Sequence, residues 1–535
     1  MNVVERVRAA YRRIEQVDRP EIWIDLLPES ALLAEASALD EHGPAGLPLF
    51  GRLVAVKGNI DVAGLPTTAG CPAYAYKPDA DAPVVASLRA AGALVLGTTN
   101  LDQFATGLVG TRSPYGAVRN SVDPSLVSGG SSSGSAVAVA LGIADLALGT
   151  DTAGSGRVPA AFNGIVGLKP TPGLLSTAGV VPACASIDCV SIFARTVSEA
   201  SLALRSLSSQ ALSVGGGPFT IGVPSSLGPL QEGWSAAFSS AVASYASAGA
   251  SVVTVDISPF LQAARLLYEG AFVAERYTAV GAFVDEHPSS VDPTVRQIIT
   301  SARDIPAHRL FADQARLASL RSAALSVLSD VDALLLPTTT EHPSLAAVAA
   351  DPLGVNARLG RFTNSTNLFG LSSLAVPAGT VGGLPFGVML LGKPYDDALL
   401  ASLASTVTSR IQIVVVGAHL RGQPLNHELT SRSGRFVASV TTAPSYRLFA
   451  LDTVPPKPGL VRVASGGAPI EAEVWDLPSA GFGTFVASIP SPLAIGKIHL
   501  SDGTFVSGFL CEELAVASAP DITSTGGWLN HLTTP

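Results

Sequence analysis

The segment best suited to catalysis in this sequence is rich in glycine and serine. Residues 127–156 read VSGGSSSGSAVAVALGIADLALGTDTAGSG and hold two Gly/Ser clusters, Gly129–Ser135 and Ala153–Gly156. Glycines beside serines at the ends of helices and strands let the backbone turn tightly and point N–H groups at an oxyanion. A flexible linker is the alternative interpretation, but the small side chains of AVAVALGIA favour a helix packed closely on a neighbour. The segment therefore indicates a serine nucleophile.

The sequence offers a lysine as the base that would activate such a serine. All eight histidines lie outside residues 43–286, so a histidine base would have to come from far along the chain. Lys57 ends the apolar stretch LVAV and precedes Gly58. Burial there would favour the neutral amine, which can accept a proton, whereas an exposed surface lysine is the ordinary alternative. Serine activated by lysine is a known variant of the Ser-His-Asp arrangement.

Alternating apolar strands and helices surround these residues, which indicates an α/β fold. Strands are expected at 51–61, 93–100 and 145–151, and helices at 82–92 and 133–144. This order places the two Gly/Ser clusters at the ends of regular elements.

The pattern changes on both sides of this core. Residues 1–50 and 257–330 have the apolar spacing of helices. Beyond residue 410, short apolar segments are broken by Pro and Gly, which predicts a small, mainly β (α+β) domain. We therefore expect a first domain over 1–409, with helices at 1–50 and a core at 51–409, and a second domain over 410–535.

Composition excludes several classes of function. Of 535 residues, 47% are hydrophobic and 14% charged, with a net charge of −9 and no basic run, which excludes disorder and makes nucleic acid an unexpected partner. No uncharged apolar run reaches the roughly 18 residues of a membrane span, and the N-terminus lacks the apolar core of a secretion signal. The four cysteines form no CxxC pair. We expect a cytoplasmic protein with no metal site.

Four separated motifs resemble those of the amidase signature family and follow one another along the chain in the order typical of it. They are GGSSSGSAVAVA (129–140), GTDTAGSGRVPAAFNGIVGLKPT (149–171), VKGNIDVAGLPTTAG (56–70) and TTNLDQFATG (98–107). Several separated motifs in the right order are far more specific than one Gly/Ser cluster. The resemblance implies the amidase signature fold, a mixed β-sheet covered by helices.

The family resemblance also implies a Ser-Ser-Lys triad. Carried over by motif, Ser155 is the nucleophile, Ser131 is the bridging serine that follows a cis peptide bond, and Lys57 is the base. Ser132 and Ser133 remain alternatives for the bridging position, because adjacent serines often only support a turn.

The mechanism that the resemblance implies needs no metal or cofactor. Neutral Lys57 takes a proton from Ser131, which takes one from Ser155, and the Ser155 oxygen attacks an amide carbonyl to form an acyl-enzyme. An oxyanion hole would stabilise the tetrahedral charge. Its expected donors are the backbone N–H groups of Thr152, Ala153, Gly154 and Ser155.

Three further features resemble the allophanate hydrolases within this family. The first is Gly156-Arg157 after the nucleophile, with the segment QFATGLVGTRSPYG upstream. The second is the segment LLYEGAFVAERYTAV, which supplies Tyr268 and Arg276. The third is a pair of C-terminal segments, GAHLRGQPLNHELT and PLAIGKIHLSDGTFVSGFLCE. Most other amidases of the family lack such a C-terminal domain, so the third feature weighs most.

Tyr268 and Arg276 suit a small anion such as allophanate. An arginine pairs with a carboxylate through two hydrogen bonds, and a tyrosine hydroxyl can fix the other oxygen. Eight residues of straight helix span ~12 Å, which is long for one small ligand. We therefore expect either a break at Gly270 or contact through one residue of the pair, and Tyr268 in a purely packing role is a further alternative.

The resemblance implies hydrolysis of allophanate to ammonia and N-carboxycarbamate, which decarboxylates. This would be the last step of ATP-dependent urea degradation, coupled to a urea carboxylase, with the chain as a homodimer. Either the C-terminal domain promotes the decarboxylation or it is spontaneous. In that domain His419 is the favoured acid/base candidate over His427, and both have ordinary packing as an even alternative; His499 is interpreted as structural.

Two other functions remain open on the sequence alone. One is a general carboxylic-amide hydrolase of the same family, whose C-terminal domain would serve only assembly. The other is the amidase component of a tRNA-linked amidotransferase, which would normally lack this C-terminal domain.

Overall fold

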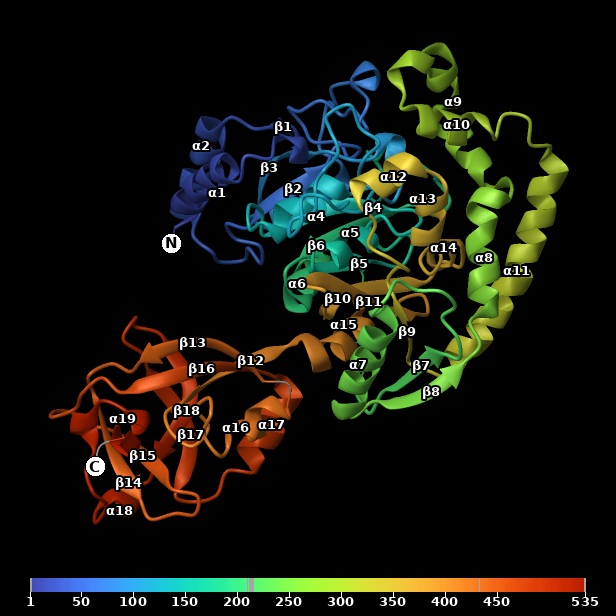
Figure 1. Ribbon diagram of the computed structural model, residues 1–535. Coiled ribbons are helices and arrows are strands. Elements are labelled where there is room, and N and C mark those ends of the chain that lie inside the picture. Colours follow the sequence, from blue (N-terminus) through green and yellow to red (C-terminus); the bar gives the residue numbers. More distant parts are fainter. Residues whose placement is uncertain (1, 209, 211–215, 433, 534–535) are drawn as a thin grey trace. The chain divides into compact units, whose positions relative to one another are not determined.

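A computed structural model describes residues 2–208, 210, 216–432 and 434–533 of the chain (Figure 1). They fall into two compact units, Met1–Ser405 and Thr406–Pro535. Each unit has its own hydrophobic core.

The first unit is built on a mixed sheet that has eleven strands within the described ranges. In their order across the sheet these are β1 (Trp23–Leu26), β3 (Leu94–Thr99), β2 (Leu53–Lys57), β4 (Leu146–Asp151), β6 (Cys189–Ala194), β5 (Val166–Lys169), β10 (Ser372–Val381), β11 (Leu384–Gly392), β9 (Ala333–Pro337), β7 (Thr220–Pro224) and β8 (Ser251–Val255). β2 pairs in parallel with β3 and β4, whereas β4 pairs antiparallel with β6. The α/β class expected from the sequence is confirmed.

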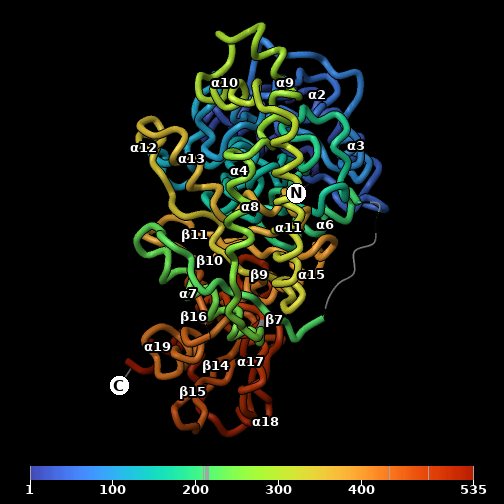
Figure 2. Tube along the Cα trace, turned by 90° about the vertical axis from the view of Figure 1, so that its right-hand side faces the viewer, coloured from blue at the N-terminus to red at the C-terminus, as the bar shows by residue number. Residues whose placement is uncertain are grey.

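Helices pack around this sheet. They are α1 (Val3–Val17), α2 (Glu29–His42), α3 (Pro83–Ala90), α4 (Ser133–Ala140), α5 (Val158–Phe162), α6 (Val197–Leu207), α7 (Trp234–Ser247), α8 (Ser258–Glu269), α9 (Ala274–Glu286), α10 (Pro293–Thr300), α11 (Ala307–Ser329), α12 (Leu345–Ala350), α13 (Gly354–Leu359), α14 (Asn364–Leu368) and α15 (Asp397–Thr408). Short 3-10 turns are η1 (Pro20–Ile22), η2 (Pro72–Tyr74), η3 (Gln103–Ala105), η4 (Ala271–Val273) and η5 (Pro288–Ser290). The helical stretch expected after residue 257 is present, and its helices α8 and α11 lie side by side in Figures 1 and 2.

The first 50 residues are not only helical, contrary to the prediction. Trp23–Leu26 forms β1, which pairs antiparallel with β3 at the edge of the sheet. Four residues are too few to carry a recognisable period. β1 can approach β3 this closely because Gly97 of β3 has no side chain. A Cβ atom at Gly97 would lie only 2.2 Å from the carbonyl oxygen of Asp25.

Small side chains let α4, which begins within the first Gly/Ser cluster, enter the core. Its residues Ser133 to Val139 are buried. A Cβ atom at Gly134 would lie 2.3 Å from the Ile22 carbonyl oxygen and 2.9 Å from the Asn100 nitrogen. The helix therefore packs against two backbone segments that a larger residue would push away.

The second unit is mainly β. Its five-stranded sheet runs β13 (Arg435–Thr441), β16 (Glu471–Pro478), β12 (Arg410–Val415), β18 (Phe505–Cys511) and β17 (Leu493–His499), and β14 (Tyr446–Leu451) pairs with β15 (Lys457–Arg462). Its helices are short: α16 (Asn426–Thr430), α17 (Ser479–Ala487), α18 (Glu513–Val516), η6 (Thr523–Thr525) and α19 (Trp528–Thr533). The α+β character expected for this part of the chain is present.

Two kinds of feature are absent from the described part of the chain. No helix there combines the length and the apolar character that crossing a bilayer requires. No group of three or more His, Cys, Asp or Glu side chains there is placed to hold a metal ion.

Replacing Gly134 by alanine tests the close packing of α4. Alanine has the higher helix propensity, yet we expect Gly134→Ala to lower the free energy of unfolding by about 1–3 kcal/mol, because its methyl group meets backbone atoms. The matched control is Gly483→Ala in α17, where no atom lies within 4 Å of the added Cβ and a gain of about 0.5–1 kcal/mol is expected. Chemical denaturation measures both, and equal gains at the two positions would contradict the packing argument.

Candidate active site

The end of β2 delivers a buried lysine to the first Gly/Ser cluster. Lys57 Nζ lies 2.8 Å from Ser131 Oγ and 2.7 Å from Thr150 Oγ1. Lys57 and Ser131 are fully buried, and the peptide bond between Gly130 and Ser131 is cis. The structure thus brings together two of the three residues expected to form the triad.

Burial changes the acidity of this lysine. It lowers the pKa of Lys57 to about 7, even though the carboxylates of Asp102, Asp151 and Asp188 act in the opposite direction; Arg276 adds to the lowering. Near neutral pH a large fraction of the amine is therefore uncharged. In that form it can accept the proton of the neighbouring hydroxyl.

The three consecutive serines of the first cluster have different partners. Ser132 Oγ donates to the carbonyl oxygen of Thr150 at 3.0 Å, and Ser133 Oγ donates to that of Asn100 at 3.3 Å. Ser131 is the one of the three that contacts the lysine amine. This geometry favours Ser131 over its neighbours for the bridging position.

Ser155 lies on the turn between β4 and α5, with 2% of its surface exposed. Within the described ranges its hydroxyl makes no hydrogen bond, to Ser131 or to any other residue. The third expected member of the triad is thus buried in the same region without a fixed partner for its oxygen.

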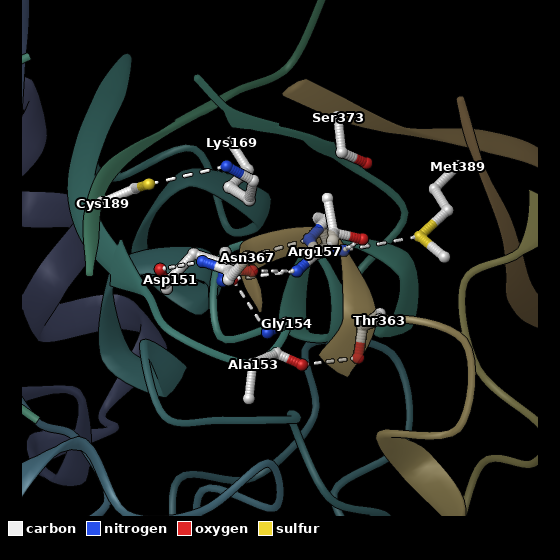
Figure 3. A network of polar contacts seen from close by, with 12 residues as sticks. Asp151, Ala153, Gly154, Arg157, Lys169, Cys189, Thr363, Asn367, Ser373 and Met389 are labelled. Atoms are coloured by element: carbon white, nitrogen blue, oxygen red, sulfur yellow. Dashed lines mark hydrogen bonds and ion pairs between the residues drawn. The ribbon is translucent and has the colours of Figure 1, made fainter. Parts of the chain in front are cut away.

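A buried ion pair shapes this turn (Figure 3). Arg157 donates from Nε and Nη2 to the carboxylate of Asp151, both at 3.0 Å, and neither side chain is exposed. Burial alone would raise the pKa of Asp151, but the Arg157 guanidinium, the Lys169 charge and the Gly156 N–H group together more than offset it, so the pKa is lowered and the carboxylate stays ionised. Asp151 in turn accepts the N–H groups of Gly154 at 2.8 Å and Gly156 at 3.0 Å.

Residues of and next to α14 hold the same turn from the other side (Figure 3). Asn367 donates to the Asp151 carbonyl oxygen at 2.7 Å and accepts from Arg157 at 2.9 Å. Thr363 donates to the carbonyl oxygen of Ala153 at 2.6 Å. Sequence reasoning missed these supports, since they lie about 210 residues from the turn.

One expected donor of the oxyanion hole is already in use. The Gly154 N–H group donates to Asp151, so it is not available to an oxyanion, contrary to the prediction. The backbone N–H groups of Thr152, Ala153 and Ser155 have no acceptor among the residues described here. Three of the four predicted donors therefore remain available.

A break in the helix brings Tyr268 and Arg276 together. α8 ends at Glu269, η4 follows Gly270, and α9 begins at Ala274. Arg276 Nη2 donates to the Tyr268 hydroxyl at 3.2 Å. The break at Gly270 is confirmed, and it removes the ~12 Å separation that a straight helix would impose.

Arg276 is a buried guanidinium that has no carboxylate partner among the described residues. It is 1% exposed, Nη1 donates to Thr106 Oγ1 at 2.9 Å, and Nε has no hydrogen-bond partner. No ion pair to Arg276 exists in the parts of the chain that the structure covers. A buried cation of this kind is unfavourable by itself and suits a site that receives an anion.

Two family profiles together cover most of the sequence. The Amidase profile matches residues 5–401, and the Allophanate hydrolase C-terminal domain profile matches residues 411–533. The chain belongs to the amidase family.

Individual relatives agree with this assignment. The urea amidolyase of Saccharomyces cerevisiae is 42% identical in an alignment 564 residues long. The aligned part covers 95% of this amidase and 31% of the relative. The 2-amino-5-chloromuconic acid deaminase of Comamonas testosteroni is 33% identical over 410 residues, which cover 73% of this amidase and 87% of the relative. The structure of Kluyveromyces lactis allophanate hydrolase superposes with a TM-score of 0.72 at 40% identity, covering 99% of this chain and 97% of that one. This amidase spans about a third of the length of the urea amidolyases that it matches.

The C-terminal unit of this amidase contains His419 in an aromatic environment. Its ring lies against those of Phe485 and Phe509, and Nε2 is 3.2 Å from Glu428 Oε2. Burial lowers the pKa of His419. A cavity of about 680 Å³ in this unit is lined by Leu420 and other residues that do not include His419. A catalytic role for His419 stays a prediction.

The buried Arg157 and Arg276 should differ in their contribution to stability. We expect Arg157→Met to lower the free energy of unfolding by about 3–5 kcal/mol, because it leaves the Asp151 carboxylate buried without its partner. We expect Arg276→Met to cost at most about 1 kcal/mol, because its hydrogen bonds go to neutral oxygens and it forms no ion pair within the described ranges. Urea denaturation of both variants measures the difference. Equal losses would show that Arg276 has a counter-charge of its own.

Proposed function

We propose that this amidase hydrolyses the terminal amide of allophanate, with Ser155 as nucleophile, Ser131 as bridging serine and Lys57 as base. The observation that carries the proposal is the buried Arg276, which lacks a carboxylate partner within the described ranges and contacts the Tyr268 hydroxyl. Allophanate carries one carboxylate and one primary amide, so it can satisfy the arginine and present a carbonyl for attack. The similarity to proteins named urea amidolyase and allophanate hydrolase supports the same substrate.

The proton transfers follow from the contacts of Lys57. The neutral amine accepts the proton of Ser131, and the Ser131 oxygen accepts that of Ser155 as the Ser155 oxygen bonds to the amide carbonyl carbon. The backbone N–H groups of Thr152, Ala153 and Ser155 stabilise the negative oxygen of the tetrahedral intermediate. Returning the proton to the departing nitrogen breaks the C–N bond and releases ammonia.

Water then completes the reaction. It attacks the acyl carbon, the base takes its proton, and the ester bond to Ser155 breaks to release N-carboxycarbamate. Loss of carbon dioxide from this product, followed by breakdown of carbamate, gives two ammonia and two carbon dioxide in total. No step requires a metal or an organic cofactor.

The context that we propose is the final step of urea degradation. A urea carboxylase would supply the allophanate in the cytoplasm, and the amidase would work as a homodimer. The C-terminal unit would act on the product or serve assembly.

Ammonia release from allophanate tests the nucleophile. We expect Ser155→Ala to reduce kcat by roughly 10⁴-fold or more, since removal of a catalytic serine has effects of this size. The control Ser239→Ala changes an exposed serine of α7 and should retain full activity. Turnover of simple aliphatic amides in place of allophanate would identify a general amide hydrolase instead.

A comparison of charged and neutral substrates tests the role of Arg276. We expect Arg276→Met to raise the KM for allophanate by roughly 10- to 100-fold, as expected for loss of a charged hydrogen bond, and to leave the KM for its neutral amide, biuret, nearly unchanged. The control is Arg265→Met, which removes an exposed arginine of α8. An equal rise for both substrates would contradict a carboxylate-binding role.

The pH dependence of kcat/KM tests the base. Because the pKa of Lys57 is lowered to about 7 and the reactive form is the neutral amine, kcat/KM should rise with pH and level off above about 7. The acid limb should have a slope of one on a logarithmic plot. A profile that is flat across this pKa would exclude Lys57 as the base.

A further inference from the structure

Asp102 is a buried carboxylate next to the triad that the reaction described above does not use. Its side chain is fully buried and accepts three backbone N–H groups, those of Val109 at 3.3 Å, Gly110 at 3.0 Å and Arg112 at 2.9 Å. No cationic side chain forms an ion pair with it in the portion of the chain that the structure describes. The carboxylate thus closes the segment 102–112 into a loop through backbone contacts.

One side of this loop rests on the bridging serine. The Asp102 N–H group donates to the Ser131 carbonyl oxygen at 3.3 Å. A Cβ atom at Gly130 would lie only 2.2 Å from Asp102 Oδ2, so the carboxylate packs directly against the residue before Ser131. A shift of Asp102 would therefore shift the Ser131 backbone relative to Lys57.

The other side of the loop holds the substrate-binding arginine. Arg276 donates to Thr106 Oγ1 at 2.9 Å and to the Ala105 carbonyl oxygen at 3.4 Å. The Arg112 side chain donates to the Thr106 carbonyl oxygen at 3.0 Å, which fixes Thr106 in turn. The backbone that Asp102 closes is thus the backbone that carries the partners of Arg276.

We propose that Asp102 is a positioning residue that holds Ser131 against Lys57 and, through the same loop, holds Arg276 in place for the substrate carboxylate. This inference rests on the proposed function, because it assigns Arg276 to a substrate anion. It links the two ends of the reaction site through one side chain that touches neither the nucleophile nor the substrate.

The charge of Asp102 gives the proposal a distinctive signature. Asp102, Asp151 and Asp188 all act to raise the pKa of Lys57 against the effect of burial, and Arg276 acts to lower it. Asp102 has the largest effect of these charges. Replacing it by neutral asparagine disfavours the protonated amine further, so the pKa of Lys57 should fall and the acid limb of kcat/KM should move to lower pH.

The test compares Asp102→Asn with two variants of Thr106. For Asp102→Asn we expect the acid limb of kcat/KM to lie roughly 1 pH unit lower. We also expect kcat to fall roughly 10- to 100-fold and the KM for allophanate to rise, because reacting groups that are misplaced react and bind less well. Thr106→Val should raise KM alone and leave the limb where it is, because it removes the hydroxyl that Arg276 contacts. Thr106→Ser keeps this hydroxyl and should restore KM.

A matched control is Asp397→Asn. Asp397 is also buried and accepts a backbone N–H group, that of Thr171 at 3.0 Å, but is not among the charges with the largest effect on Lys57. The variant Asp397→Asn should leave KM and the acid limb of kcat/KM unchanged. Thermal unfolding reports whether each variant is folded. The inference is overturned if folded Asp102→Asn keeps both the limb and the KM of the parent.

A probe that does not depend on the amide separates this inference from the proposed function. The rate at which a small fluorophosphonate reacts with Ser155 reports activation of the nucleophile, and its pH dependence should move to lower pH in Asp102→Asn. If the unmodified protein releases no ammonia from allophanate, the proposed function fails. If the pH dependence of phosphonylation is the same in Asp102→Asn as in the unmodified protein, the proposed influence of Asp102 on Ser131 and Lys57 is overturned.

Discussion

Removing the amine of Lys57 from water lowers its pKa to about 7, and the carboxylates of Asp102, Asp151 and Asp188 act against that effect. Without these carboxylates, burial would lower the pKa of the amine further. Asp102 and Asp151 lie close enough to act on the amine through their charges, while the amine itself contacts only the hydroxyls of Ser131 and Thr150 among the described residues. Lys57 thus keeps a pKa of about 7 without a direct ion pair among the described residues.

Two buried arginines illustrate opposite uses of the same side chain. Arg157 is paired through two hydrogen bonds with Asp151, and the pair fixes the turn that carries Ser155. Arg276 donates hydrogen bonds only to neutral oxygens among the described residues, those of Thr106, Ala105 and Tyr268. The first is part of the scaffold, whereas the second has no ion-pair partner within the described ranges.

Close approach of backbone segments lets many polar groups gather where β2 and β4 end. Gly97, Gly130 and Gly134 each lie where a Cβ atom would meet another chain segment at less than 2.5 Å. Larger side chains at these positions would separate β1 from β3, or the loop at Asp102 from Ser131. Small residues therefore do more here than permit turns: they set the distances on which the hydrogen bonds depend.

The sequence by itself determined the α/β class, the family resemblance and the choice of Lys57, because these depend on local patterns of residues. Local patterns also suggested the break at Gly270, but whether it brings Tyr268 and Arg276 into contact depends on how two helices pack. Only the tertiary structure decided that the Gly154 N–H group is taken by Asp151 and that Asp102 joins the two ends of the site. The reason is physical: hydrogen bonds and charge effects act over a few ångströms in space between residues that lie far apart along the chain.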